Sequence, residues 1–209
     1  MPLLPIIQAE RKNGDEPFLS KGEALPFDVT SFWRWAFSDF VSNTARGILA
    51  EYIVAQAVGV GDAGIRPEWA SFDVTTPEGI KIEVKSAAYI QSWQQNDYSK
   101  ISFSVAKKRG WDPQSGLAIE PTRHADVYVM ALLHHKEQET LNPLDLDQWS
   151  FYVVARQALD ARDRSQHSIT MPSLTGMGIK PVTYSELGAA VRTAAARVLQ
   201  AAEVPISLP

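Results

Sequence analysis

Three charged side chains between Ser71 and Ser86 have the types and spacing that chemistry on a phosphate needs. They are Asp73, Glu83 and Lys85, which follow the pattern Asp-x9-Glu-x-Lys. Carboxylate oxygens, waters and substrate phosphates are the ligands that Mg²⁺ prefers. A lysine beside them can orient a water molecule or stabilise negative charge. The set therefore predicts a site for phosphodiester hydrolysis that depends on a divalent cation.

A β-hairpin is expected to position these side chains. Apolar and polar residues alternate in 71–75 and again in 80–85, which is typical of strands. The residues 77–79 would form the loop, and their last member is a glycine, which accepts a left-handed backbone. A three-residue loop pairs Asp73 with Glu83 and collects the polar residues on one face, whereas a two-residue loop would mix the two faces.

The expected pairing puts two negative charges opposite each other. Like charges that face each other across a strand pair destabilise it, and a bound cation would remove the conflict between Asp73 and Glu83. The alternative is a solvated strand face on which Lys81 and Lys85 neutralise the acids, because polar strand faces are common.

A third carboxylate, Glu51, lies in a segment that is expected to form a helix over roughly 44–58. Ser42 or Asn43 would cap this helix, and it would end near Gly59. The helix is apolar nearly all round, and a lone carboxylate on a buried face is costly unless it is paired or bound to a metal. Two explanations remain open, which are an ion pair with an arginine and a third acidic group that reaches the hairpin.

Glu51 on a helix, Asp73 on one strand and the run Glu83-Val84-Lys85 on the next resemble the PD-(D/E)XK nuclease superfamily. This resemblance implies the restriction-endonuclease-like fold and metal-dependent cleavage of nucleic acid. It implies that Asp73, Glu83, the backbone carbonyl of Val84 and Glu51 hold Mg²⁺ or Mn²⁺. It also implies that Lys85 positions the attacking water and stabilises charge on the phosphate.

The resemblance covers roughly residues 43–154 and leaves the substrate contacts to other side chains. Gln91 is a candidate for a contact with substrate. The densest basic run of the chain, Lys107, Lys108 and Arg109, would suit a phosphate backbone. A solvated loop is the commoner explanation for such a run.

The remaining segments supply the other elements of the expected fold. Residues 1–28 contain four prolines and are expected to form an irregular arm, whereas 29–209 would form one nuclease-like domain. Asp28 or Thr30 would cap a first helix whose aromatic side chains are expected to pack in the core. Further elements are expected as strands over 101–105, 126–133 and 149–154, a short helix near Leu159, and a C-terminal helix that a capping box of Thr183 and Glu186 begins.

Composition limits the class of protein. The 209 residues suffice for one domain with a sizeable core. The chain has no cysteine, which excludes disulfides, zinc–thiolate sites and a thiol nucleophile and favours a cytoplasmic location. No membrane span and no signal-peptide pattern is apparent. The formal net charge of −4 counts mildly against a nucleic-acid binder, although a local basic groove can coexist with it.

The order of the expected elements predicts an α/β or α+β fold, in which helices flank a mixed sheet. Three functional hypotheses follow. The first is a metal-dependent endonuclease or exonuclease that acts on DNA, with RNA as the alternative. The second is a catalytically silent module of the same fold that binds nucleic acid or serves assembly, and the third is an unrelated α/β protein. A homodimer through the aromatic first helix is a further option.

Overall fold

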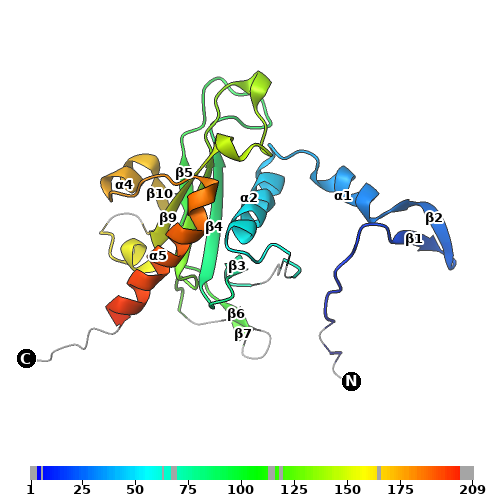
Figure 1. Ribbon diagram of the computed structural model, residues 1–209, viewed down its shortest axis with the longest axis horizontal. Coiled ribbons are helices and arrows are strands. Elements are labelled where there is room, and N and C mark those ends of the chain that lie inside the picture. The colour runs from blue at the N-terminus through cyan, green and yellow to red at the C-terminus, as the bar shows by residue number, and fades with distance from the viewer. Residues whose placement is uncertain are drawn as a thin grey trace, which may run out of the picture.

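A four-stranded mixed sheet forms the centre of the protein in the computed structural model (Figure 1). The structure describes residues 4–5, 7–62, 64–66, 70–112, 116–117, 120–163 and 166–202. The strands of the sheet, in spatial order, are β3 (Val74–Thr75), β4 (Lys81–Ala88), β8 (Val127–Leu133) and β9 (Trp149–Ala155). β4 and β8 run parallel, and the other two pairs are antiparallel. This confirms the predicted mixed sheet.

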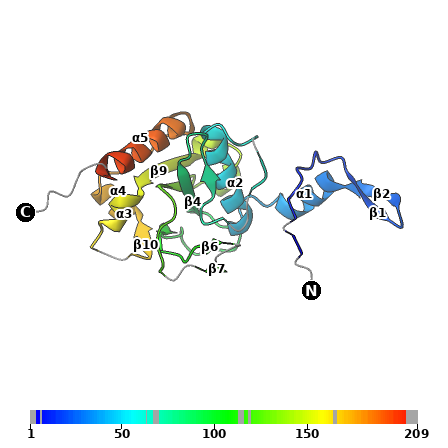
Figure 2. The ribbon, with the colours of Figure 1, turned by 90° about the horizontal axis from the view of Figure 1, so that it is seen from below.

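Two helices cover one face of the sheet, as Figures 1 and 2 show. They are α2 (Asn43–Ala57) and α5 (Tyr184–Ala202). α5 begins at the predicted capping box, because Glu186 accepts a hydrogen bond from the Thr183 backbone N–H at 2.8 Å. Apolar side chains of both helices pack against β4, β8 and β9 in one core. Within the described residues, no helix is both long and apolar enough to cross a membrane.

The opposite face of the sheet has its own apolar core. Its cover consists of α3 (Arg156–Asp160), α4 (Met171–Gly176) and a small sheet of β5 (Ser102–Ser104) with β10 (Ser168–Thr170). All residues of β8 are buried because it lies between two strands and two covered faces, as its apolar sequence predicts. The remaining short elements are β6 (Trp111–Asp112), β7 (Gly116–Leu117) and the 3-10 turns η1 (Gln138–Thr140) and η2 (Leu146–Gln148).

The hairpin between β3 and β4 has the predicted register. Val74 pairs with Ile82, and the Thr76 N–H donates to the Ile80 carbonyl at 3.0 Å. Gly79 ends the three-residue loop with a φ of 87°, a conformation that a side chain would strain. The regular pairing ends at Val74, because the Asp73 N–H donates to the Ile82 carbonyl at 2.9 Å and the Asp73 side chain accepts from the Val84 N–H. The predicted pairing of Asp73 with Glu83 is therefore not part of the observed register.

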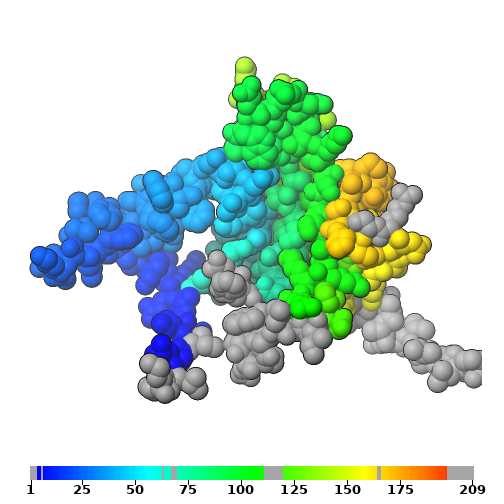
Figure 3. Space-filling model, turned by 180° about the vertical axis from the view of Figure 1, so that it is seen from behind, coloured from blue at the N-terminus to red at the C-terminus, as the bar shows by residue number. Residues whose placement is uncertain are grey.

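The described residues 4–5 and 7–16 contain no helix or strand, which agrees with the predicted irregular arm, but residues 17–28 depart from this prediction. They form a hairpin of β1 (Pro17–Ser20) and β2 (Glu23–Asp28), which projects from the body of the protein (Figure 3). Lys21 and Gly22 between the strands have φ values of 52° and 87°. Two successive positive φ angles are typical of the tight turns that join antiparallel strands, so this turn explains the hairpin.

The prediction that the aromatic first helix packs in the core is wrong. Helix α1 (Val29–Phe37) has no buried residue, although Asp28 caps it as expected by accepting from the Ser31 N–H at 2.7 Å. Trp35 is 85% exposed. The reason is that α2 and α5 already cover the adjacent face of the sheet, and α1 lies beside β1 and β2 instead (Figures 1 and 2).

Candidate active site

The polar face of β4 carries a buried carboxylate between two lysines. Glu83 is only 4% exposed, and its Oε1 atom lies 2.6 Å from Lys85 Nζ and 2.8 Å from Lys108 Nζ. Burial alone would raise the pKa of Glu83, but the two ammonium groups outweigh burial and hold this pKa below its ordinary value. Glu83 is therefore ionised at neutral pH, with both lysines as its counter-ions.

Asp73 has the opposite electrostatic character. Burial and the charge of Glu83 raise the pKa of Asp73 to about 6, and Glu51 adds to this effect. Two influences lower the pKa of Asp73 and compensate this rise only in part. They are the Val84 N–H, which donates to Asp73 Oδ2 at 2.7 Å, and the charge of Lys85. A negative charge on Asp73 is thus the least compensated charge of the group.

The edge of β4 next to Asp73 is open to a ligand, because β3 is short. β3 begins only at Val74, so no strand residue pairs with Val84 on this edge. The Val84 N–H donates to the Asp73 side chain instead. The N–H and C=O of one strand residue point to the same neighbour. The Val84 carbonyl oxygen therefore faces the edge on which Asp73 lies.

Glu51 reaches the same region but has a basic partner. Arg66 approaches it with two nitrogens, Nε at Oε2 and Nη2 at Oε1, the latter at 3.1 Å. The Glu51 side chain is partly buried, at 15% exposed, and of the two explanations open for it the ion pair with an arginine is the one the structure contains. Glu51, Arg66 and Asp73 also line one cavity of about 490 Å³ beside α2. Among the described residues, no three acidic or histidine side chains form a ready-made metal cluster.

The structure separates Lys108 from its basic neighbours. The three basic residues Lys107, Lys108 and Arg109 are all exposed. Of these three, only Lys108 forms an ion pair with a described residue. Its backbone is held by two hydrogen bonds with Thr122, at 2.9 and 3.0 Å, and these fix the loop opposite Glu83. Glu83 outweighs the effect of burial and raises the pKa of Lys108 above its ordinary value.

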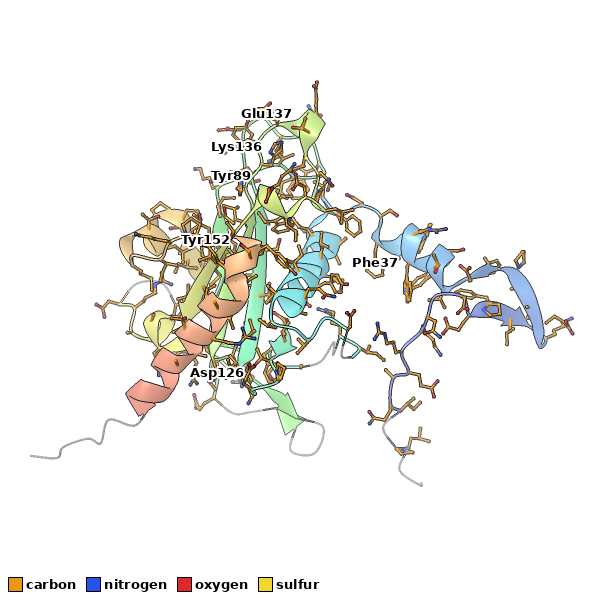
Figure 4. The ribbon with its side chains drawn as sticks, in the orientation of Figure 1. Phe37, Tyr89, Asp126, Lys136, Glu137 and Tyr152 are labelled. Carbon is orange, nitrogen blue, oxygen red and sulfur yellow. The ribbon has the colours of Figure 1, made fainter. Side chains whose placement is uncertain are left out.

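Gln91 lies beyond the end of β4, and its side chain forms hydrogen bonds mainly within its own loop. Its side chain donates to the Ala88 carbonyl at 2.9 Å and to the Ser99 hydroxyl at 3.1 Å, and it accepts from Arg46 at 3.2 Å. This loop lines a second cavity of about 500 Å³. Lys136 Nζ, which also lines it, lies 4.3 Å from the ring centroid of Tyr89 (Figure 4). Gln91 thus stabilises a loop next to this cavity, away from Asp73.

Two residues of the site were not identified in the sequence. Arg66 pairs with Glu51 from a position 15 residues further along the chain, and no local sequence pattern predicts such a contact. Tyr128 on β8 pairs with Glu83 on β4, and burial together with the charge of Glu83 raises the pKa of its hydroxyl. The sequence feature that could have pointed to Tyr128 is its hydroxyl group in an otherwise apolar strand.

Comparison with known proteins identifies one family. The family model described as Bacteriophage T4 endonuclease IV matches residues 36–170. The matched region contains Glu51, the hairpin with Asp73, Glu83 and Lys85, and the loop with Lys108. No curated protein matches the chain. The match supports a nuclease that acts on nucleic acid.

Proposed function

Because the chain belongs to the bacteriophage T4 endonuclease IV family, we propose that it is a metal-dependent nuclease that hydrolyses phosphodiester bonds in DNA. One observation carries this proposal. A buried glutamate, a neighbouring aspartate and two lysines gather at an open strand edge. Clustered acids and lysines with shifted pKa values occur preferentially at functional sites.

The oxygen atoms of the site suit Mg²⁺ or Mn²⁺. We propose Asp73, Glu83 and the Val84 carbonyl as ligands, since hard divalent cations prefer carboxylate and carbonyl oxygens. The raised pKa of Asp73 supports this assignment, because burial and the charge of Glu83 disfavour its ionised form, and a bound cation would offset both effects. Glu51 would join the site through a second ion or a water if Arg66 released it. Bound Mg²⁺ would make water more acidic and neutralise charge on the phosphate.

The chain's own side chains would position the reacting groups. Lys85 orients the attacking water and stabilises the negative charge that develops on the phosphate oxygens. The water gives up a proton to solvent as its oxygen bonds to phosphorus, the ester bond to the leaving oxygen breaks, and that oxygen takes up a proton from solvent. Lys107 and Arg109, which are exposed, contact neighbouring phosphates of the strand.

We also propose membership of the PD-(D/E)XK superfamily. Its support is the combination of an acid on α2, an aspartate directly before β3 that lies close to a glutamate on β4, and a lysine two residues further on. The second candidate, a catalytically silent module that binds nucleic acid, is favoured by one observation. Glu51 and Glu83 are both neutralised by basic side chains, as stable structural ion pairs are.

Cleavage assays with a matched lysine pair distinguish these functions. Purified protein is incubated with single-stranded DNA, double-stranded DNA and RNA, in Mg²⁺, Mn²⁺ or EDTA. We expect cleavage of DNA that needs the metal and is lost in Lys85→Ala. Lys81→Ala is the control, because Lys81 shares the strand and the face but contacts the ring of Phe72, at 5.4 Å from its centroid.

The outcomes separate the proposals. Calorimetric binding of Mn²⁺ without any cleavage would support the silent module. Cleavage that persists in EDTA, or equal activity of Lys85→Ala and Lys81→Ala, would contradict the proposed mechanism. Circular dichroism melting curves verify that each variant is folded.

A further inference from the structure

The projecting segment 17–37, which we call the arm, exposes a large apolar surface. It comprises β1, β2 and α1, and it extends away from the body in two perpendicular views (Figures 1 and 2) and in the space-filling view (Figure 3). Seven of its large apolar side chains are exposed. They are Phe18, Leu19, Phe27, Phe32, Trp33, Trp35 and Phe37.

The arm lacks the packing that such short elements need. A two-stranded hairpin is marginally stable by itself in water, and so is an isolated helix of nine residues. The internal contacts of the arm are local, such as Phe18 against Phe27 with ring centroids 5.1 Å apart. In the described structure β1 and β2 pair only with each other, which leaves both outer strand edges free. An additional surface is therefore needed to stabilise the arm.

We propose that the arm is a dimerisation element that packs against the arm of a second copy of this chain. A large aromatic side chain has about 150–250 Å² of surface, so the exposed fractions of the seven side chains correspond to roughly 700 Å² per copy. A standard stable interface buries about 800 Å² on each partner. In a two-fold dimer the same surface patch of both copies meets, and two apolar arms can pack against each other in this way.

The charge of the arm favours a protein partner over nucleic acid. Residues 17–37 contain two basic and two acidic side chains, and thus no excess of positive charge. A phosphate backbone requires such an excess. The family match begins at residue 36, so nearly the whole arm lies outside the nuclease region. This inference is therefore independent of the proposed function.

The mass of the full chain in solution tests the arm directly. Light scattering coupled to size-exclusion chromatography should give twice the chain mass of 23.1 kDa. Trp35→Asp should raise the dissociation constant of the dimer by about 100-fold or more, because each dimer loses two hot-spot side chains. Trp93→Asp is the matched control, since Trp93 is 54% exposed but lies on the body, and it should leave the dimer unchanged.

A cross-linking experiment covers the case in which Trp35→Asp perturbs folding. The chain has no cysteine, so Trp35→Cys introduces a single thiol on α1 and Trp93→Cys introduces one on the body. A thiol-specific bifunctional reagent should link Trp35→Cys into dimers and leave Trp93→Cys monomeric in denaturing gels. A monomeric wild-type chain at its highest soluble concentration would overturn the proposal. So would a dimer that both Trp35→Asp and Trp93→Asp leave intact, or equal cross-linking of the two cysteine variants.

Discussion

Replacing Asp73 with asparagine should stabilise the metal-free protein at neutral and alkaline pH. The pKa of Asp73 is raised from 3.8 to about 6, so the ionised form is disfavoured in the folded state. One pKa unit corresponds to about 1.36 kcal/mol, and the shift therefore costs the wild type about 3 kcal/mol above its folded-state pKa. Asparagine has the same size, carries no charge and can still accept from the Val84 N–H.

The sign of the pH dependence follows from the raised pKa. The folded wild type binds a proton more tightly than the unfolded chain, so this contribution to stability is complete below 3.8 and is lost as the pH rises through about 6. The advantage of Asp73→Asn should be about 3 kcal/mol near pH 8, which is about 9 °C in midpoint for a domain of this size. It should shrink towards zero as the pH falls to about 4.

Urea unfolding in EDTA at several pH values measures this advantage. Asp126→Asn is the control, because Asp126 (labelled in Figure 4) also accepts a backbone N–H of β4, from Lys81 at 3.0 Å. It is not among the charges that act on Asp73, and its replacement should give no such gain. Added Mn²⁺ should stabilise the wild type more than Asp73→Asn. The reasoning is refuted if Asp73→Asn is no more stable than the wild type near pH 8, or if its advantage is the same at all pH values.

Four further predictions concern the site and its supporting structure. Lys108→Ala should slow cleavage by about 100-fold. Lys107→Ala should mainly weaken the binding of nucleic acid, and it should lower the salt dependence of that binding by about one in log–log slope. Equal effects of the two substitutions in single-turnover assays would contradict the placement of Lys108. Gly47→Ala should stabilise the protein against urea by about 0.5–1 kcal/mol, because a Cβ there meets no atom within 4 Å. Gly79→Ala should destabilise it by about 1–2 kcal/mol, and a neutral result would show that the turn relaxes. Arg123→Met should cost about 2–4 kcal/mol of stability to urea, because two backbone carbonyl oxygens that accept from the buried guanidinium would lose their partner. The ion pair with Asp160 adds little, since this carboxylate is 42% exposed. A loss below about 1 kcal/mol would contradict the role of these two hydrogen bonds.

The hairpin could be predicted from the sequence because local rules determine it. Two alternating runs and one loop glycine allow a single register that keeps apolar residues on one face, and that register pairs Val74 with Ile82 as observed. The buried strand β8 was equally accessible, since its residues are apolar on both faces. The capping box of α5 is a third local signal, and it too was correct.

The errors and omissions concern contacts between distant parts of the chain. The aromatic residues of α1 are as apolar as a core, but composition does not tell whether the surface that covers them belongs to the same chain. Arg66 pairs with Glu51 through the path of a loop, which has no local signal. Lys108 differs from Lys107 only because the backbone bonds to Thr122 aim its side chain at Glu83. Such contacts depend on tertiary packing, which periodicity does not encode.

The three acids of the site differ in their counter-charges, and this difference suggests how a cation and a substrate would depend on each other. Glu83 has two lysines and Glu51 has an arginine, whereas Asp73 has mainly a backbone N–H. A divalent cation would therefore gain most from contact with Asp73. Once it also neutralised Glu83, Lys85 and Lys108 would no longer be needed as counter-ions. Both ammonium groups would then be available to phosphate oxygens, so metal binding should strengthen the binding of nucleic acid by more than the cation's own charge.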